Sequence, residues 1–220
     1  DGMCSASEYG AMPNWDVSSV TRMKNAFAGK TDFNGNIGAW DVSSVTTMYY
    51  MFVGATSFNK NIGSWNVSSV TDMSVMFLFA SSFNSDISNW DVSSVTAMFA
   101  MFAKALVFNG VISSWNVGSV TDMGNMFDQA SAFNSDISNW DVRNVTNMRG
   151  MFKYATAFNQ PLNLWNVSSI TNMSFMFLGA SEFNGNISSW DVSSVTDIGD
   201  MFSEASVFNQ DISNWDVGSV

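Results

Sequence analysis

The chain contains no histidine among its 220 residues. It therefore lacks Ser-His-Asp and Cys-His catalytic arrangements, histidine general bases and the commonest metal ligand. The sequence also contains no P-loop, dinucleotide-binding or EF-hand motif. Carboxylate pairs such as Asp86 with Asp91 recur as repeat positions, whereas a catalytic site is normally a unique break in a pattern. We therefore expect no enzyme activity, no metal and no cofactor.

Positive charge is scarce, with 8 Lys and Arg against 19 Asp and Glu and a net charge of −11. Nucleic acids and anionic membrane surfaces attract basic patches, so neither is an expected partner. No apolar run approaches the roughly 18 residues of a spanning helix, so direct membrane insertion is not expected. The composition is 46% hydrophobic and 15% aromatic. These values predict a large core and argue against a disordered acidic tail.

The single cysteine, Cys4, has no partner for an internal disulfide. The sequence leaves open whether it is a free thiol, a lipid attachment point or an incidental residue of a cap. The sequence begins at Asp1, which fits either removal of a leader or a fragment of a longer protein. Five N-x-[ST] sequons occur, and chance in a Ser- and Asn-rich repeat is the preferred interpretation of them. These sequons begin at Asn66, Asn144, Asn166, Asn172 and Asn186.

What the chain does contain is a repeat. All nine tryptophans recur at an interval of 25 residues, within the unit F-N-x-x-I-x-x-W-[D/N]-V-S-S-V-T-x-M-x-x-M-F-x-x-A. Each fixed letter forms a column of equivalent residues, so each column must meet the same environment in every unit. One unit buries too little apolar surface to fold alone, and stacking on its neighbours supplies the rest. The Trp residues expected to be structural are Trp40, Trp65, Trp90, Trp115, Trp140, Trp165 and Trp190.

The segment V-T-x-M predicts a short strand in each unit, because β-branched residues follow polar turn residues. Strand alternation places Thr and Met inward and the intervening x in solvent. The segment M-F-x-x-A predicts a short helical turn. The segments F-N and W-[D/N]-V-S-S predict turns in which Asn or Asp bonds the backbone two residues on. A metal-binding ladder is the alternative interpretation of the Asp/Asn column after Trp.

The predicted fold class is an α/β repeat solenoid with one 25-residue coil per repeat. We expect short parallel strands on one face and short helical turns on the other. Residues 1–13 are expected to form an N-terminal cap. Residues 14–220 are expected to form a single solenoid of about eight repeats with the last one truncated.

The phrase W-D-V-S-S-V-T-x-M-x-x-M-F-x-x-A-x-x-F-N resembles the repeat of bacterial surface proteins and mycoplasma-type lipoproteins. That repeat is related to BspA-like leucine-rich repeats and also occurs in microalgae. The resemblance covers about residues 14–220. It implies a leucine-rich-repeat-like solenoid with T-x-M in place of L-x-L, and a secreted or cell-surface location.

The most variable positions lie at and just after the predicted strand. The aromatics there are typical anchors for partners, and basic residues lie among them. The predicted partner-binding residues are Tyr49, Tyr50, Phe99, Phe175, Arg22, Lys24 and Arg149. The alternative interpretation is that the aromatics shield backbone or reflect drift. A second variable pair, which includes Phe79 and Tyr154, is predicted on the opposite, helical side.

The sequence thus predicts a non-enzymatic scaffold that binds a protein or glycan, as in protein–protein interaction or adhesion at a cell surface. The alternative is a structural subunit of a larger assembly, stacked end to end or attached to a membrane complex as an extrinsic component. Ice binding is a minor alternative, because a regular column of Thr hydroxyls can order water. The mixed composition of the column beside it argues against ice binding.

Overall fold

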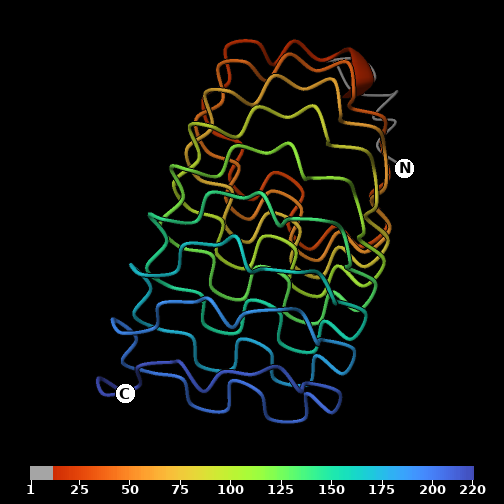
Figure 1. The fold of residues 1–220 in the computed structure, drawn as a ribbon. Coiled ribbons are helices and arrows are strands. Elements are labelled where there is room, and N and C mark those ends of the chain that lie inside the picture. Colours follow the sequence, from red (N-terminus) through yellow and green to blue (C-terminus); the bar gives the residue numbers. More distant parts are fainter. Residues whose placement is uncertain (1–11) are drawn as a thin grey trace.

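The computed structural model describes residues 12–220, which form a stack of similar coils, one for each 25-residue repeat (Figure 1). Within this part of the chain the only helix is the 3-10 helix η1, Met12–Asn14. The only β-pairing there consists of seven isolated parallel bridges, each between residues 25 apart. They run in one series from Arg22–Thr47 to Asn172–Asp197. Most of the predicted cap, residues 1–13, lies outside the described residues.

The predicted helical turns over M-F-x-x-A do not form. In the second repeat this stretch contains successive β-turns, closed by hydrogen bonds from the Met51 N–H to the Met48 carbonyl and from the Ala55 N–H to the Phe52 carbonyl. The Phe52 N–H instead donates across to the Met76 carbonyl of the next coil at 2.9 Å. A helix would require that N–H to bond within its own segment, so pairing between coils excludes helix here. The predicted strands likewise shorten to single-residue bridges.

The constant Thr column points outward, and the prediction that it faces the core was wrong. Val45 and Met48 are both fully buried, and two residues separate them. Strict strand alternation cannot bury residues three apart, so the chain bends and exposes Thr46. The Thr46 N–H and hydroxyl both donate to the Thr21 carbonyl, at 2.8 and 3.1 Å. An exposed hydroxyl column suits the ice-binding alternative, but these hydroxyl hydrogens are already used within the protein.

The core is one hydrophobic cluster that continues through successive coils. Like aromatic rings lie on like: Trp65 and Trp90 stack with ring centroids 6.4 Å apart and planes 4° apart. Phe77 stacks on Phe52 of the preceding coil at 5.4 Å and on Phe83 of its own coil at 3.9 Å. Buried Met side chains fill the remaining space, and their flexible thioethers adapt to irregular gaps.

Each Trp of the stack also anchors its coil through a hydrogen bond. The Trp115 indole N–H donates to the Ile87 carbonyl of the preceding coil at 3.2 Å, while its ring is 3% exposed. The same bond recurs from Trp40, which donates to Met12, to Trp215. A buried indole needs such an acceptor, and this one fixes the ring relative to the neighbouring coil.

The constant Asn after Phe forms a ladder. The Asn109 side-chain oxygen accepts the Asn134 backbone N–H of the next coil at 2.9 Å, and this bond repeats along the column from Asn34 to Asn209. The prediction that this Asn bonds the backbone two residues on was therefore wrong. A stacked amide can satisfy the neighbouring backbone instead of its own turn.

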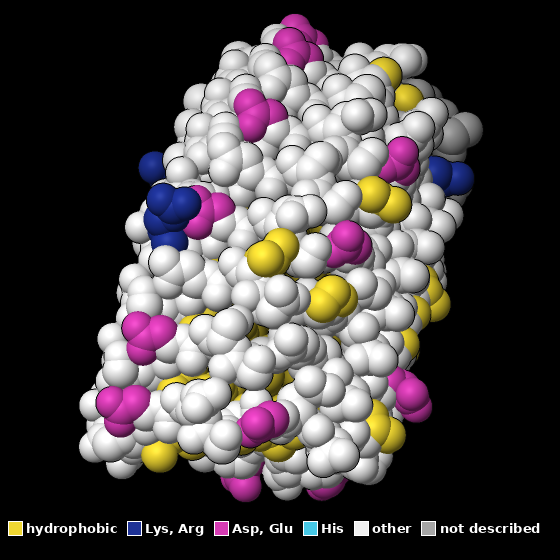
Figure 2. All heavy atoms as spheres, viewed as in Figure 1, with side chains coloured by type: hydrophobic (Ala, Val, Ile, Leu, Met, Phe, Trp, Pro, Cys, Tyr) yellow, Lys and Arg dark blue, Asp and Glu magenta, His cyan; other side chains and the backbone are white. Residues whose placement is uncertain are grey.

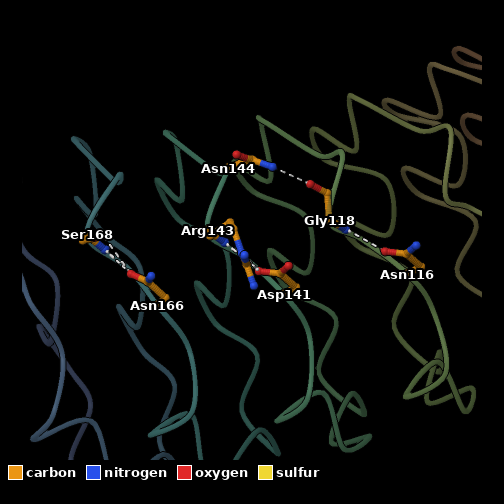
Figure 3. A network of polar contacts seen from close by, with 7 residues as sticks. All are labelled: Asn116, Gly118, Asp141, Arg143, Asn144, Asn166 and Ser168. Atoms are coloured by element: carbon orange, nitrogen blue, oxygen red, sulfur yellow. Dashed lines mark hydrogen bonds and ion pairs between the residues drawn. The ribbon is translucent and has the colours of Figure 1, made fainter.

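The Asp/Asn column after Trp forms the predicted turns (Figure 3). The Asn166 side-chain oxygen accepts both the N–H and the hydroxyl of Ser168, at 3.2 and 2.7 Å. In the Asp turns, the Ser hydroxyl and then the Ser N–H lower the carboxyl pKa of Asp41 and Asp91. Residues 12–220 contain no group of three acidic or Cys side chains placed to hold a metal ion.

The turn carboxylates predict acid sensitivity. Their folded pKa values lie below the usual 3.8, so their stabilising effect is present above about pH 4 and is lost as pH falls through the folded pKa. Replacing Asp41, Asp91 and Asp191 with Asn, which already occupies position 66, should reduce the drop in Tm between about pH 7 and about pH 3. Thermal unfolding followed by circular dichroism measures the drop. An unchanged drop in the triple variant would contradict the assignment.

The Trp–carbonyl bond predicts a position-dependent cost of substitution. Trp115→Phe removes one buried hydrogen bond and leaves a void, so we expect a loss of about 2–4 kcal/mol. Trp215→Phe should cost clearly less, because Trp215 is only partly buried. Urea denaturation of both variants measures the loss in the free energy of unfolding. Equal losses would contradict a stabilising role for the buried indole and its hydrogen bond.

Candidate functional site

The candidate site is the variable face, which we define as the two variable residues of M-x-x-M together with the two of F-x-x-A in each coil. Each pair occupies the centre of a β-turn, and the second residue has positive φ, as at Tyr50 (61°) and Phe79 (62°). This is the geometry of a type II turn. Such a turn places both central residues outside the continuous core, and this explains how varied side chains fit without disturbing it. Some of them, such as Val75 at 4% exposure, are buried against one another.

Both variable pairs belong to one surface. A small apolar cluster outside the core joins Val75 and Ala100, from the first pair, to Ala103, from the second, with Tyr49, Tyr50, Val53 and Leu78 packed against it. The prediction that the second pair lies on the opposite, helical side was therefore wrong. No helix intervenes to turn the chain away, and the two turns follow each other directly.

The positions with positive φ favour glycine over every other residue. Glycine adopts this conformation freely, and four of these positions hold it. Twelve other positions hold larger residues, each at a cost of roughly 1–2 kcal/mol. Val75 is the most unfavourable, because a β-branched side chain rarely tolerates positive φ. The larger residues are Asn25, Tyr50, Val75, Phe79, Ala100, Lys104, Asn125, Gln129, Tyr154, Phe175, Asp200 and Glu204, and the glycines are Gly29, Gly54, Gly150 and Gly179.

The structure brings only some of the predicted aromatics together. Tyr49 and Tyr50 are half-buried, with ring centroids 4.3 Å apart, and pack on the apolar cluster. Phe99 is 37% exposed, and its carbonyl accepts the N–H of Val75 in that cluster. Phe175 is half-buried and lies three coils further along the stack. Tyr49 and Tyr50 therefore also shield the surface cluster, which agrees in part with the alternative interpretation of these residues.

The predicted basic residues Arg22, Lys24 and Arg149 are exposed. Lys24 lies over the Tyr49 ring at 5.0 Å, and Arg149 lies over Phe175 at 4.8 Å. Such cation–π contacts orient a cation without neutralising it. Arg22 lies in the bridge column instead, paired with Thr47.

Two further cation–ring pairs on this face come from residues that the sequence did not single out as basic anchors. The Lys104 ammonium lies 4.5 Å from the Phe79 ring centroid, and that of Lys153 lies 5.8 Å from Tyr154. The only ion pair among residues 12–220 is Arg143 with Asp141, at 2.8 Å (Figure 3). The cations of the variable face therefore have rings, and no carboxylate, in direct contact.

Asp128 is a functional candidate that sequence reasoning missed. It is half-buried, and one of its carboxylate oxygens is enclosed without a hydrogen-bond partner. Burial raises its pKa, while the charges of Lys153, Lys104 and Arg149 oppose that shift. Its signal was present in the sequence, because it is the only acidic residue in a column that otherwise holds Ala28, Val53, Leu78, Ala103, Lys153, Leu178 and Ser203.

The x column of T-x-M was predicted to be free in solvent, but most of its members shape the face. The side-chain oxygens of Asp122 and Asn172 accept the N–H two residues on, at 2.9 Å each. Across coils, the Asn147 amide donates to Asp122 at 2.9 Å. These bonds hold the start of the variable turn in a fixed orientation.

Acidic side chains are scattered over the surface seen in Figure 2, whereas Lys and Arg side chains gather at its edges. Exposed apolar side chains also occur away from the variable face, notably Val111 at 62% and Leu164 at 66% exposure. Across residues 12–220 the structure contains no helix with the length and apolar character needed to span a bilayer.

Contacts that recur every 25 residues along a stack of coils define a repeat protein. The chain belongs to the family described as Mycoplasma protein of unknown function, DUF285, whose model matches residues 3–109, 84–169 and 162–220. This agrees with the resemblance to mycoplasma-type repeat proteins. The comparison with curated proteins gives no match.

The turn geometry predicts which glycines are required. Gly54 has a φ of +69°, and a methyl group there would meet only ordinary contacts. Gly54→Ala should therefore cost about 1 kcal/mol through backbone strain alone. Gly118→Ser, which restores the repeat's usual Ser where φ is not positive, should be close to neutral. Urea denaturation compares the two variants, and a neutral Gly54→Ala would contradict the turn assignment.

Proposed function

We propose that this protein is a non-enzymatic scaffold that binds another macromolecule through its variable face. The proposal includes a leucine-rich-repeat-like solenoid and a secreted or cell-surface setting, as the sequence resemblance implies. Membership of the mycoplasma repeat family supports the repeat architecture in this proposal.

The observation that carries the proposal is the choice of residues at positive φ. Glycine would relieve strain at these positions, and the protein holds glycine at only four of them. The side chains of Phe79, Tyr154 and Phe175 do not pack into the continuous core, so core burial does not offset the backbone strain at these positions. Residues kept against a local stability preference are expected at functional sites. A binding role for the face explains their presence.

The surface itself suits recognition. The half-buried Tyr49 and Tyr50 pack against an apolar cluster, so their rings have limited freedom to lose on binding. Phe99 is exposed and directly precedes Ala100 of that cluster. Aromatic anchors of this kind contribute most of the affinity in typical protein interfaces. The alternative of a structural subunit in a larger assembly would use the same face or the ends of the stack.

Replacing Tyr49, Tyr50 and Phe99 with Ser should reduce partner capture by about tenfold or more, because the central anchors are lost. The continuous core does not contain these side chains, so the coils should stay folded. Immobilised wild-type and variant chains would be compared by quantitative mass spectrometry of the cell-surface proteins they retain. The matched control is Val111→Ser with Leu164→Ser. It removes two apolar side chains that lie away from the variable face and are more exposed than Phe99. Equal retention by the triple variant and wild type would reject this face as the site.

A further inference from the structure

The cations of the variable face remain unpaired although carboxylates are abundant. The chain has 19 Asp and Glu for 8 Lys and Arg, so each cation has ample choice of partner. Yet Lys24, Lys104, Arg149 and Lys153 lie over aromatic rings, and none has a carboxylate within ion-pair distance among the described residues. These positive groups therefore remain available to carboxylates brought by a partner.

Three of these cations gather at one place. The Lys104 N–H donates to the Asp128 carbonyl of the next coil at 2.7 Å, and the Lys153 and Arg149 carbonyls accept N–H groups of the coil that carries Asp128, at 2.6 and 2.7 Å. All three charges also oppose the raised pKa of Asp128. Three cations against the carboxylates of Asp128 and Asp122 leave this region with an excess of one positive charge on an acidic molecule. The two lysines are half-buried, and their contacts with Phe79 and Tyr154 limit their motion. Preorganised, partly desolvated cations bind carboxylates more strongly than mobile surface lysines do.

An apolar surface adjoins these cations. Half-buried Leu78 precedes Phe79, and Leu106, which is 45% exposed, follows Lys104 by two residues. Phe79 is 44% exposed and lines a hollow of about 310 Å³. The other residues that line this hollow are Thr56, Ser81, Lys104, Leu106 and Gln129. A partner's apolar side chain placed in this hollow would lie beside the Lys104 ammonium, so apolar and anionic groups are recognised side by side.

We infer that the variable face binds an acidic, amphipathic segment of a partner protein. Apolar side chains of the segment occupy the hollow at Phe79 and Leu106 and cover the cluster around Tyr50. Its carboxylates contact Lys104, Arg149 and Lys153. This inference rests on the proposed function and specifies the partner's chemistry.

A protein segment fits this surface better than a glycan does. Sugars stack on bare aromatic faces, whereas Tyr49, Phe79 and Phe175 each carry a cation over the ring. Alternating apolar and acidic side chains match both the hollow and the cations, and both kinds of group occur together on peptides.

The test is selection from a displayed library of random peptides on the immobilised chain, followed by fluorescence anisotropy with the selected peptides. We expect the selected sequences to be enriched in Asp and Glu beside Leu, Ile, Phe or Trp. Their affinity should fall about tenfold or more for Lys104→Ala, Arg149→Ala and Lys153→Ala combined, and should weaken with added salt.

The matched control removes three of the four basic residues that lie outside this face: Lys30→Ala, Lys60→Ala and Arg143→Ser. Both triple variants lose the same charge, so a long-range field effect would change them equally, whereas a local site predicts that the control binds like wild type. Circular dichroism confirms that both are folded.

Neutral or basic selected peptides, equal loss in both triple variants, or no enrichment at all would overturn the inference. If the selected peptides are neutral but bind less tightly to the variant with Tyr49→Ser, Tyr50→Ser and Phe99→Ser, binding would still lie on the variable face. The proposed function would then stand although this inference fails. Sedimentation could instead show a dimer that dissociates in the variant with Lys104, Arg149 and Lys153 replaced. That result would identify a second copy of the chain as the occupant and would overturn the inference of a separate partner protein.

Discussion

The structure depends on like residues of neighbouring coils lying in register. A constant 25-residue interval places Trp over Trp, Phe over Phe and Asn beside Asn. Each stacked pair is modest alone, but ring stacking, the indole–carbonyl bond and the Asn bond all act between the same two coils. A shift of one residue would break all three together, so register is strongly specified even with almost no regular strand. Although regular β-pairing is limited to single bridges, alternate N–H groups such as those of Tyr50 and Phe52 also donate to the next coil. Backbone hydrogen bonds and side-chain columns therefore hold the coils together.

Much of this arrangement follows from the sequence. The interval of the Trp residues indicated stacked coils, and the Asp/Asn column after Trp indicated turns that the hydrogen bonds confirm. Local conformation was harder to predict. The segment V-T-x-M resembles a strand, but the burial of both Val45 and Met48 bends it and turns Thr46 outward. The helical turn failed for a similar reason, because N–H groups such as that of Phe52 bond to the next coil. Competition between local and inter-coil hydrogen bonds cannot be judged from one unit.

The candidate site, too, was predictable from the sequence only in part. Variability identified Tyr49 and Tyr50, but the apolar cluster beneath them depends on Val75 and Ala100 of the next two coils. Asp128 was visible as a lone acidic residue in its column, but its place beside Lys104 and Lys153 of the neighbouring coils requires the stacked geometry. The positive φ of twelve larger residues could not be inferred, because glycine occupies only a minority of these positions. Composition indicates a type II turn mainly where glycine is frequent.

The two type II turns of each coil have a consequence for evolution. Backbone conformation there is imposed by the stack, so one side chain can replace another without altering the path of the chain, and recognition can diversify independently of folding. Every bulky replacement at a positive-φ position nevertheless costs stability, and the contacts between coils must offset that cost. The number of large residues displayed at once is therefore limited by how strongly the columns of neighbouring coils adhere. Glycine positions such as Gly29 and Gly54, where an added side chain would meet no close contact, leave room for further large residues.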